Sequence, residues 1–443
     1  MSYAGRRVLI LGLAREGISL AGWLSREGAE VTATDESADL GGRGKALAAL
    51  PIRLCLGRDY PELIAETDVL FVSPGVPETN PVYRAARDQG VPVESMTTLF
   101  FERCPGRIIG VTGSSGKTTT TGLIGHILRE AGRDVRVGGN IGEPMLDLLP
   151  TVTSTTDVVL ELSSFQLDIL RRSPSVAVVT NISPNHLDRH GTMEAYIQAK
   201  LNIVRHQSPN DHAVLNADDP TAERFAAETK AEVLHFGGRL VEGNELLLPP
   251  GRRLTAAVDV PLLGRHNLEN VSAAAVTADL LGVPTPVIAS AIRTFRPAPH
   301  RLQTVAERGG VRYIDDSIAT SPARASVALQ AIDAPVLLIA GGRDKRLPWD
   351  DFARLAVRKV RSLYLIGEAA PLIEDAVRRQ EGGILEHIAR CRTLTEAVKA
   401  AGSAARPGDV VLLSPGCASY DMFKDFEERG RLFAQSVEAL SAA

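Results

Sequence analysis

The sequence predicts an α/β protein made of consecutive domains, each built on a parallel sheet. Short apolar runs, such as residues 7–11, 108–111 and 336–340, recur between segments of helix length, which is the alternation that βαβ units require. Several of these runs end in glycine-rich or polar turns, as strands do at the ligand-binding edge of an open sheet. The chain has 443 residues, more than one hydrophobic core usually holds, so about two to four domains are expected.

Composition excludes several classes of protein. The chain is 44% hydrophobic and 23% charged, which is ordinary for a globular protein. Its net charge of −4 argues against a general nucleic-acid binder, which carries a basic excess. Four scattered cysteines without metal-binding spacing indicate a reducing compartment. No signal peptide precedes the first apolar run, and no apolar stretch is long enough to span a bilayer. We therefore expect a cytoplasmic protein.

The first segment contains a strand, turn, helix and strand over residues 7–35. Asp35 ends the second strand, where a dinucleotide-binding fold places its ribose-binding carboxylate. The glycine fingerprint is incomplete because its middle position is Ala14. NAD, another nucleotide and plain βαβ packing therefore all remain open. A later apolar run leads into the rigid turn Ser73-Pro74-Gly75, and the segment closes near Met96.

A glycine-rich turn follows the apolar run 108–111 and precedes a predicted helix. Its sequence, Gly110 to Thr120, resembles a phosphate loop, although Val111 stands where the strict pattern has glycine. Backbone N–H groups in such a turn cradle phosphate oxygens. Lys117 would reach the outer phosphates and the Thr118 hydroxyl would hold Mg²⁺. The alternative is a surface turn before an ordinary helix.

Three further residues of the middle segment have chemical potential. Glu161 lies inside a buried-strand pattern and needs a partner, either a divalent metal or an ion-pairing side chain. His186 follows another strand, and Lys200 lies near the apolar side of a predicted helix. Burial would make the Lys200 amine reactive, whereas a surface position would leave it a solvated cation. The turn 138–142 is rich in glycine.

The rest of the chain predicts one more α/β domain. Asn267 and Asn270 precede or begin an alanine-rich helix and would face the same side. The proline-rich stretch 295–301 is typical of a linker. Apolar runs at 311–314, 336–340, 362–366 and 410–413 then alternate with helical segments. Three of them end in the turns 315–317, 341–345 and 414–419, which would form a ligand-binding edge.

These motifs, in this order, resemble those of the Mur ligases, the ATP-dependent amino-acid ligases of peptidoglycan synthesis. The matching stretches are 110–120, 138–142, 161–166, 181–189, 196–200, 216–219, 264–270, 300–301 and 414–426. Within the family, 160–167 and 413–419 look most like members that add D-glutamate to UDP-N-acetylmuramoyl-L-alanine. The length and the short first domain agree with this.

The resemblance implies an α/β fold of three domains. A Rossmann-like UDP-sugar-binding domain would span 1–96, a central P-loop ATPase-type domain 97–299, and a C-terminal Rossmann-like domain 300–443. The C-terminal domain would bind the amino acid and close onto ATP, with a hinge near His300. A single UDP diphosphate, with no redox cofactor, would explain why Ala14 can replace the fingerprint glycine.

The resemblance also implies the site residues. The UDP-sugar would contact Leu13, Ala14, Arg15, Asp35, Ser73, Pro74, Gly75 and Asn140. ATP would contact Gly113, Ser114, Ser115, Gly116, Lys117, Thr118, Thr119, Asn267, Asn270, Arg301 and Asp316. Glutamate would contact Thr320, Lys345, Ser419 and Phe426. Two Mg²⁺ ions would be held by Thr118, Glu161, His186 and a carbamate on Lys200. Lys117, His186 and Lys200 would be the catalytic residues.

The chain departs from the family at Ile318, where the glutamate-adding members carry a lysine. An isoleucine cannot pair a carboxylate, so Arg324, Arg343 and Arg346 are candidates to supply the missing charge. L-Glutamate therefore stays open as a substrate beside D-glutamate. Two further classes also stay open: another member of the ligase superfamily, such as folylpolyglutamate synthase, and a P-loop switch protein. We expect the protein to act as a monomer on small molecules, without nucleic acid or membrane.

Overall fold

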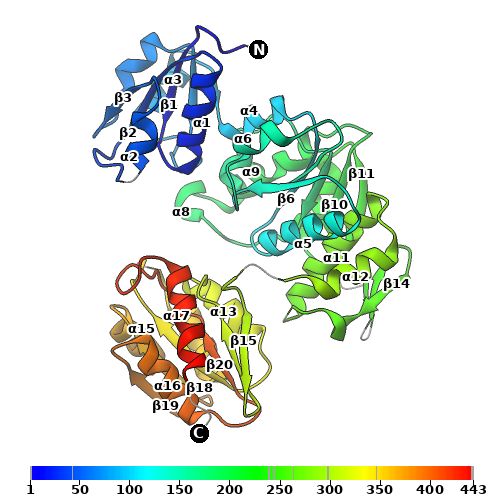
Figure 1. Cartoon of the computed structure of the whole chain (residues 1–443), viewed down its shortest axis with the longest axis vertical. Helices are drawn as coiled ribbons and strands as arrows, with labels where there is room; N and C mark the ends of the chain where they lie inside the picture. Colours follow the sequence, from blue (N-terminus) through cyan, green and yellow to red (C-terminus); the bar gives the residue numbers. More distant parts are fainter. Residues whose placement is uncertain are drawn as a thin grey trace. The chain divides into compact units, whose positions relative to one another are not determined.

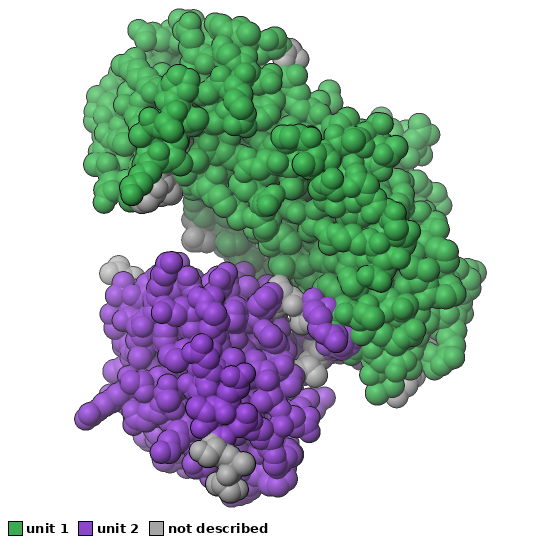
Figure 2. Space-filling model, in the orientation of Figure 1, with its two compact units in different colours: residues 1–260, 268–295 green, residues 261–267, 296–443 purple. Residues whose placement is uncertain are grey.

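The computed structural model describes residues 2–41, 43–237, 240–242, 245–262, 264–296, 299–345 and 347–440. It divides into two compact units, coloured separately in Figure 2. The first unit holds residues 1–260 and 268–295, and the second holds 261–267 and 296–443. Residues 297 and 298 of the predicted linker lie outside the described residues, as does the candidate Arg346.

The N-terminal domain is a parallel sheet with helices on both faces (Figure 1), and its strand order is β3-β2-β1-β4-β5. The strands are β1 (Arg7–Leu11), β2 (Glu30–Asp35), β3 (Arg53–Leu56), β4 (Val69–Val72) and β5 (Val93–Glu94). The helices are α1 (Arg15–Arg26), α2 (Arg43–Ala48) and α3 (Pro81–Asp88), with a 3₁₀ turn over Pro61–Glu66. Because side chains alternate along a strand, Val8 and Ile10 pack with α1 while Leu9 and Leu11 pack with α3.

The middle domain belongs to the same compact unit. Its parallel sheet has the order β11-β10-β9-β6-β8-β7. The strands are β6 (Arg107–Thr112), β7 (Val135–Gly139), β8 (Asp157–Glu161), β9 (Val176–Val179), β10 (His212–Asn216) and β11 (Glu232–Phe236). The helices are α4 (Met96–Arg103), α5 (Lys117–Glu130), α6 (Met145–Leu148), α7 (Ser164–Leu167), α8 (Leu187–His190), α9 (Met193–Arg205), α10 (Pro220–Glu223), α11 (Arg265–Leu280) and α12 (Thr285–Thr294).

Smaller elements complete this domain. An antiparallel sheet joins β12 (Val241–Glu242), β13 (Glu245–Leu248) and β14 (Arg252–Ala256). The 3₁₀ turns are Leu149–Thr151, Arg224–Glu228 and Ala257–Asp259. The phosphate-loop sequence connects β6 to α5 (Figure 1), as predicted. The C-terminal ends of β6 and β8 are adjacent because these strands are paired in parallel, with Val111 opposite Glu161.

The C-terminal domain has the strand order β15-β16-β20-β17-β18-β19. Its strands are β15 (Gln303–Arg308), β16 (Val311–Asp315), β17 (Val336–Gly341), β18 (Val360–Ile366), β19 (His387–Arg390) and β20 (Val410–Leu413). Its helices are α13 (Pro322–Gln330), α14 (Asp350–Lys359), α15 (Ala370–Arg378), α16 (Leu394–Ala404) and α17 (Phe426–Glu438). β15 is antiparallel to β16, and the other pairs are parallel.

Both faces of this third sheet are covered. Leu338 and Ala340 of β17 pack in one cluster with α13, α14 and α15. Leu337 and Ile339 of the same strand pack in another cluster with α16 and α17. This burial on both faces explains the continuous apolar run of β17. Among the described residues, no helix combines the length and apolar character needed to cross a membrane.

Candidate functional site

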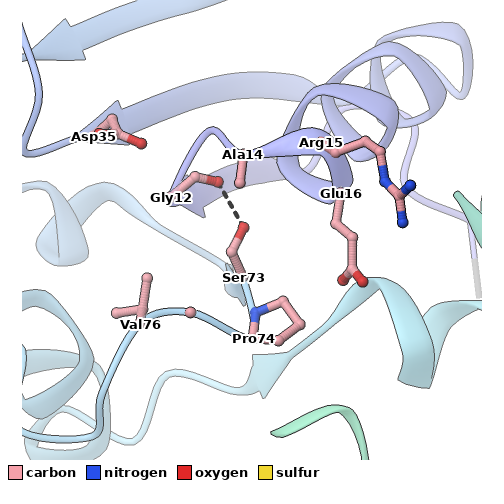
Figure 3. Close-up of a pocket in the computed structure, with 9 residues that line it drawn as sticks. Gly12, Ala14, Arg15, Glu16, Asp35, Ser73, Pro74 and Val76 are labelled. Atoms are coloured by element: carbon pink, nitrogen blue, oxygen red, sulfur yellow. Dashed lines mark hydrogen bonds between the residues drawn. The ribbon is translucent and has the colours of Figure 1, made fainter. Parts of the chain in front are cut away.

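A cavity of about 370 Å³ opens at the C-terminal edge of the first sheet. It is lined by Gly12, Ala14, Arg15, Glu16, Asp35, Ser73, Pro74, Gly75 and Val76 (Figure 3). The structure thus brings together most of the residues predicted to bind the UDP-sugar. Leu13 is buried beneath the turn, and Asn140 follows β7 in the middle domain. Glu16 belongs to the turn 13–16 that the resemblance assigns to the uridine diphosphate, whereas Gly12 and Val76, which adjoin the predicted residues, were missed.

Hydrogen bonds fix the shape of this cavity. The Asp35 carboxylate accepts from the Leu13 N–H at 2.7 Å, and the Ser73 hydroxyl donates to the Gly12 carbonyl at 2.7 Å (Figure 3). Gly12 has φ +92, and a Cβ on Gly17 would lie 2.1 Å from the Gly12 oxygen. Both positions therefore require glycine. The middle fingerprint position, Ala14, is the N-cap residue of α1 and has ordinary extended backbone, which does not require glycine.

Two charged residues at the start of α1 contact the middle domain. Figure 3 shows their side chains leaving the helix in different directions. Arg15 donates to the Gly142 carbonyl at 2.7 Å, and Glu16 accepts from the Gln166 amide at 2.8 Å. Burial raises the pKa of the Glu16 carboxyl, and the Gln166 hydrogen bond and the Arg15 charge offset part of that rise. These two side chains thus connect the edge of the cavity to the turn after β7 and to helix α7 of the middle domain.

The phosphate loop has the conformation that its glycines permit. Gly113 has φ +151 and Gly116 has φ +81, and a Cβ on Gly113 would lie 1.9 Å from the Thr180 hydroxyl. Asn181 holds the loop through its side-chain oxygen, which accepts from the Ser115 N–H at 3.0 Å. The Lys117 ammonium donates to the Gly113 carbonyl at 2.9 Å. A fixed loop that ends in the N-terminus of α5 is a suitable anion site.

Two further residues predicted to bind ATP, Ser114 and Thr119, lie in or next to the phosphate loop. Ser114 donates to the Ser183 carbonyl at 2.8 Å and its hydroxyl lies 2.9 Å from that of Tyr196. Thr119 is buried in the first turn of α5. Ser114 therefore connects the loop to α9, the helix that contains Lys200.

Glu161 ends β8 beside the phosphate loop. Its side chain is buried. One carboxylate oxygen accepts from the Thr118 hydroxyl at 2.7 Å, and the other accepts from the Asn140 amide at 2.9 Å. A carboxylate and a hydroxyl are oxygen ligands of the kind that Mg²⁺ prefers, with phosphates and water completing its shell. Within the described residues, no group of three or more His, Cys, Asp and Glu side chains surrounds a potential metal position, so any metal here needs ligands of other types.

Lys200 is buried, so the interpretation of a solvated surface residue is wrong. Its side chain is only 1% exposed. The amine donates to the Thr112 hydroxyl at 3.1 Å and to the Gly113 carbonyl at 2.9 Å. Burial, and next the charge of Lys117, lower the pKa of the Lys200 ammonium well below its usual range, while Glu161 offsets part of the effect. The middle domain therefore holds a lysine whose charged form is destabilised, with its amine against the Gly113 carbonyl of the phosphate loop.

His186 occupies a different environment. It precedes α8 in a left-handed conformation with φ 54, which is uncommon for a residue with a side chain. Its side chain is exposed, and its ring packs edge-on against Phe165 at 5.1 Å. His190 stacks on the same Phe165 ring at 5.0 Å, and Arg189 lies over it. The predicted joint role of His186 and Lys200 stays a prediction.

Asn267 and Asn270 both lie within α11, because the helix begins at Arg265. Both side chains are buried. The Thr120 hydroxyl is 3.5 Å from the Asn270 side-chain oxygen, and a Cβ on Gly116 would meet that oxygen at 2.1 Å. The structure thus places Asn270 directly against the phosphate loop.

In the C-terminal domain, Asp316 follows β16 and is 5% exposed. Its carboxylate accepts from the Ser414 hydroxyl at 2.8 Å and from the Leu302 N–H at 3.3 Å. Burial raises the pKa of Asp316 to about 7, and these hydrogen bonds and the nearby Arg301 charge lower it partly. In a neighbouring contact, the His300 Nδ1 lies 2.7 Å from an Asp315 carboxylate oxygen, within hydrogen-bond distance.

The predicted glutamate residues lie on the same edge of that sheet. Lys345 donates to the Thr320 hydroxyl at 3.1 Å. Ser419 is buried after β20, and Phe426 begins α17, with its carbonyl accepting from Ser317 at 2.7 Å. These residues therefore come from the loops that follow β16, β17 and β20.

Sequence reasoning missed Arg429, whose side chain is completely buried. Its guanidinium donates to the carbonyls of Ser317 and Cys417 at 2.8 and 3.2 Å. Burial lowers the pKa of Arg429 to about 10. Arg429 therefore fixes the two loops that flank the predicted glutamate residues. Its helical surroundings in the sequence gave no sign that it is buried.

The three domains match models of one protein family. The Mur ligase MurD-like N-terminal domain matches residues 6–95, the Mur ligase middle domain 111–278, and the Mur ligase glutamate ligase domain 300–417. The chain belongs to the Mur ligase family, and the predicted three-domain α/β fold is confirmed.

The similarity to curated relatives is more specific. A UDP-N-acetylmuramoylalanine–D-glutamate ligase from Symbiobacterium thermophilum is 46% identical, with 98% of each chain covered. Ligases of the same name from Roseiflexus and Acetivibrio thermocellus are 42% and 41% identical. For the first, 100% of each chain is covered, and for the second, 99% of this chain and 97% of the relative. The assignment to the D-glutamate ligase branch rests on these matches.

Solved structures agree at the level of the fold. A UDP-N-acetylmuramate–alanine ligase from Thermotoga maritima superimposes with a TM-score of 0.61 at 20% identity, covering 98% of this chain and 100% of that one. A MurF ligase from Thermotoga maritima, solved in complex with ADP, gives 0.58 at 19% identity, covering 99% and 96%.

Proposed function

We propose that this protein joins D-glutamate to UDP-N-acetylmuramoyl-L-alanine with hydrolysis of ATP to ADP and phosphate, in the synthesis of peptidoglycan precursors. The main support is the match, over nearly all of both chains, to ligases named for this reaction. The geometry agrees with it, because one chain contains a nucleotide-sized cavity, a phosphate loop beside a buried carboxylate, and a cationic edge in a third domain.

The reaction has two steps. The L-alanyl carboxylate attacks the γ-phosphorus of ATP, ADP leaves, and an acyl phosphate forms. The amine of D-glutamate then attacks the acyl carbon, giving a tetrahedral intermediate that loses a proton and expels phosphate. In the first step an anion approaches a polyanion, so cations near the γ-phosphate stabilise the transition state. Lys117 would supply such a charge from the phosphate loop.

ATP would be bound by residues of two domains. Gly113, Ser114, Ser115, Gly116, Lys117, Thr118, Thr119 and Asn270 would hold its phosphates and adenine from the loop and α11. Asn267, also in α11, would join them, and Arg301 and Asp316 would complete the site when the C-terminal domain closes. The hinge for this closure would lie near His300, where the linker 295–301 meets the C-terminal domain.

Thr118 and Glu161 fit a magnesium ion, because their oxygens already share one hydrogen bond beside the phosphate loop. Magnesium would neutralise charge on the ATP phosphates. A second ion would be held by His186 and a carbamate on Lys200. The lowered pKa of Lys200 favours a neutral amine, which attacks CO₂ and releases one proton to give the carbamate. The present hydrogen bonds to Thr112 and Gly113 would then have to rearrange.

The UDP-sugar would occupy the first domain and reach Asn140 of the middle domain, and glutamate would occupy the third domain. Leu13, Ala14, Arg15, Asp35, Ser73, Pro74, Gly75 and Asn140 would contact the UDP-sugar, and Thr320, Lys345, Ser419 and Phe426 would contact glutamate. We place the domain boundaries at 96/97 and 299/300. We further propose that the enzyme acts as a cytoplasmic monomer without nucleic-acid or membrane partners.

Phosphate release tests this function. The assay compares ATP and Mg²⁺ alone with mixtures that add UDP-N-acetylmuramoyl-L-alanine, D-glutamate, or both. The proposal requires rapid phosphate release only with both, at one phosphate per D-glutamate incorporated. Release that depends on neither substrate would contradict it.

A further inference from the structure

Besides the buried Arg429, the third domain contains another cation near Lys345. Arg324 lies in the first turn of α13, and its guanidinium is 3.5 Å from the Ile318 carbonyl. The same carbonyl accepts from the Thr320 N–H at 2.9 Å. Arg324 therefore lies next to the loop that presents Thr320 to Lys345.

The charge on Arg324 is available for a ligand. Among the described residues of the domain, no carboxylate forms an ion pair with Arg324 or Lys345. Arg343, by contrast, is held by Glu368 at 3.1 Å through two nitrogens. Of the two candidate arginines that the structure describes, Arg343 forms an ion pair with a carboxylate and Arg324 does not.

Arg324 and Lys345 each contact the loop 318–320, through the Ile318 carbonyl and the Thr320 hydroxyl. Burial, and next the charge of Arg324, lower the pKa of the Lys345 ammonium. The N-terminus of α13 adds positive potential here, and the Ser321 side chain makes no capping hydrogen bond to it. Two like charges at a helix N-terminus destabilise the free protein, but they attract an anion when it binds.

We propose that Arg324 and Lys345 together bind the carboxylates of the incoming glutamate, and that Arg324 replaces the charge missing at Ile318. This inference rests on the proposed function. Glutamate reacts through its amine, so both of its carboxylates keep their charge throughout the reaction. Contacts to these carboxylates therefore stabilise the bound substrate and the transition state equally, and removing one raises KM while leaving kcat nearly unchanged.

The test measures steady-state kinetics of Arg324→Ala with all three substrates. The KM for D-glutamate should rise about tenfold, as for the loss of one charged hydrogen bond at a partly exposed site. The KM values for ATP and the UDP-sugar, and kcat, should stay within about twofold, as expected for loss of uniform binding. Arg354→Ala is the matched control, because Arg354 is an exposed arginine of the same domain paired with Asp351.

A charge restored at a neighbouring position provides the second arm. Ile318→Lys in the Arg324→Ala background should recover most of the lost affinity for glutamate, since the backbone of residue 318 lies 3.5 Å from the Arg324 guanidinium and a lysine there would return a cation to the same loop. An unchanged glutamate KM in Arg324→Ala, or no recovery in the double variant, would overturn the role of Arg324. Failure of the wild-type enzyme to ligate glutamate at all would instead refute the proposed function.

Discussion

Asp316 should make the stability of the C-terminal domain depend on pH in a way that Asp316→Asn removes. Burial raises the pKa of this carboxyl from 3.8 to about 7. Between these values the folded protein binds the proton more tightly than the unfolded chain. Stability therefore falls as pH rises through this window and levels off above about pH 7. The full effect is about 4 kcal/mol, since the difference is about 3 pKa units.

The measurement compares urea unfolding at pH 5.5 and pH 8.5. Between pH 5.5 and the folded pKa of about 7 lie about 1.5 pH units over which stability falls. The free energy of unfolding of the wild-type protein should therefore decrease by about 2 kcal/mol more than that of Asp316→Asn between the two conditions. Any pH-independent cost of the amide, such as a weakened contact to the Leu302 N–H, cancels in this double difference. The chain has two tryptophans, and Trp349 is buried in the C-terminal domain. A Trp23→Phe background therefore makes fluorescence report this domain alone.

Equal pH dependence in the two proteins would refute the reasoning. It would mean that Asp316 stays ionised in the folded protein at pH 5.5. If raising the pH lowered the free energy of unfolding more in Asp316→Asn than in the wild-type protein, the predicted sign of the effect would be wrong.

Three further predictions concern the lysines. Lys117→Ala should reduce kcat by about 10²–10³-fold, because it removes a charge directed at the transferred phosphate; near-wild-type phosphate release would contradict this. If Lys200 is carbamylated, activity should fall in CO₂-depleted buffer and return with bicarbonate, and Lys200→Ala should bind ATP without turnover. Mass spectrometry showing an unmodified amine in active, magnesium-loaded enzyme would argue against the carbamate. Lys345→Ala should raise the KM for glutamate far more than the KM for ATP, and equal effects on both would exclude Lys345 as a carboxylate ligand.

The sequence predicted the interior strands of each sheet and missed several at the edges. β1, β6 and β17 are buried on both faces, so their apolar runs are unambiguous. β3, β11 and β19 each pair with one neighbour and contain exposed polar residues. Their short, mixed sequences do not differ from those of loops. β15 was missed for the same reason, and it is antiparallel to β16.

Site residues on local turns were predictable, and those that depend on tertiary contacts were not. The Gly113–Thr119 loop and the Ser73 turn form within a few residues, so spacing identified them. Composition alone could not decide whether Lys200 was buried, because that depends on how α9 packs beneath β6. Similarly, Glu16 meets Gln166, 150 positions away in the sequence, and no local pattern indicates such a contact.

The central claim is that this enzyme selects D-glutamate as its amino acid. A single competition reaction tests it, containing the protein, UDP-N-acetylmuramoyl-L-alanine, ATP, Mg²⁺ and equal concentrations of D-glutamate, L-glutamate, lysine and diaminopimelate. The nucleotide product is then analysed by mass spectrometry, and its released amino acid by chiral chromatography. We predict a product that contains one D-glutamate. Incorporation of L-glutamate would contradict the stereochemistry, and incorporation of lysine or diaminopimelate would contradict the assignment to the D-glutamate ligase branch.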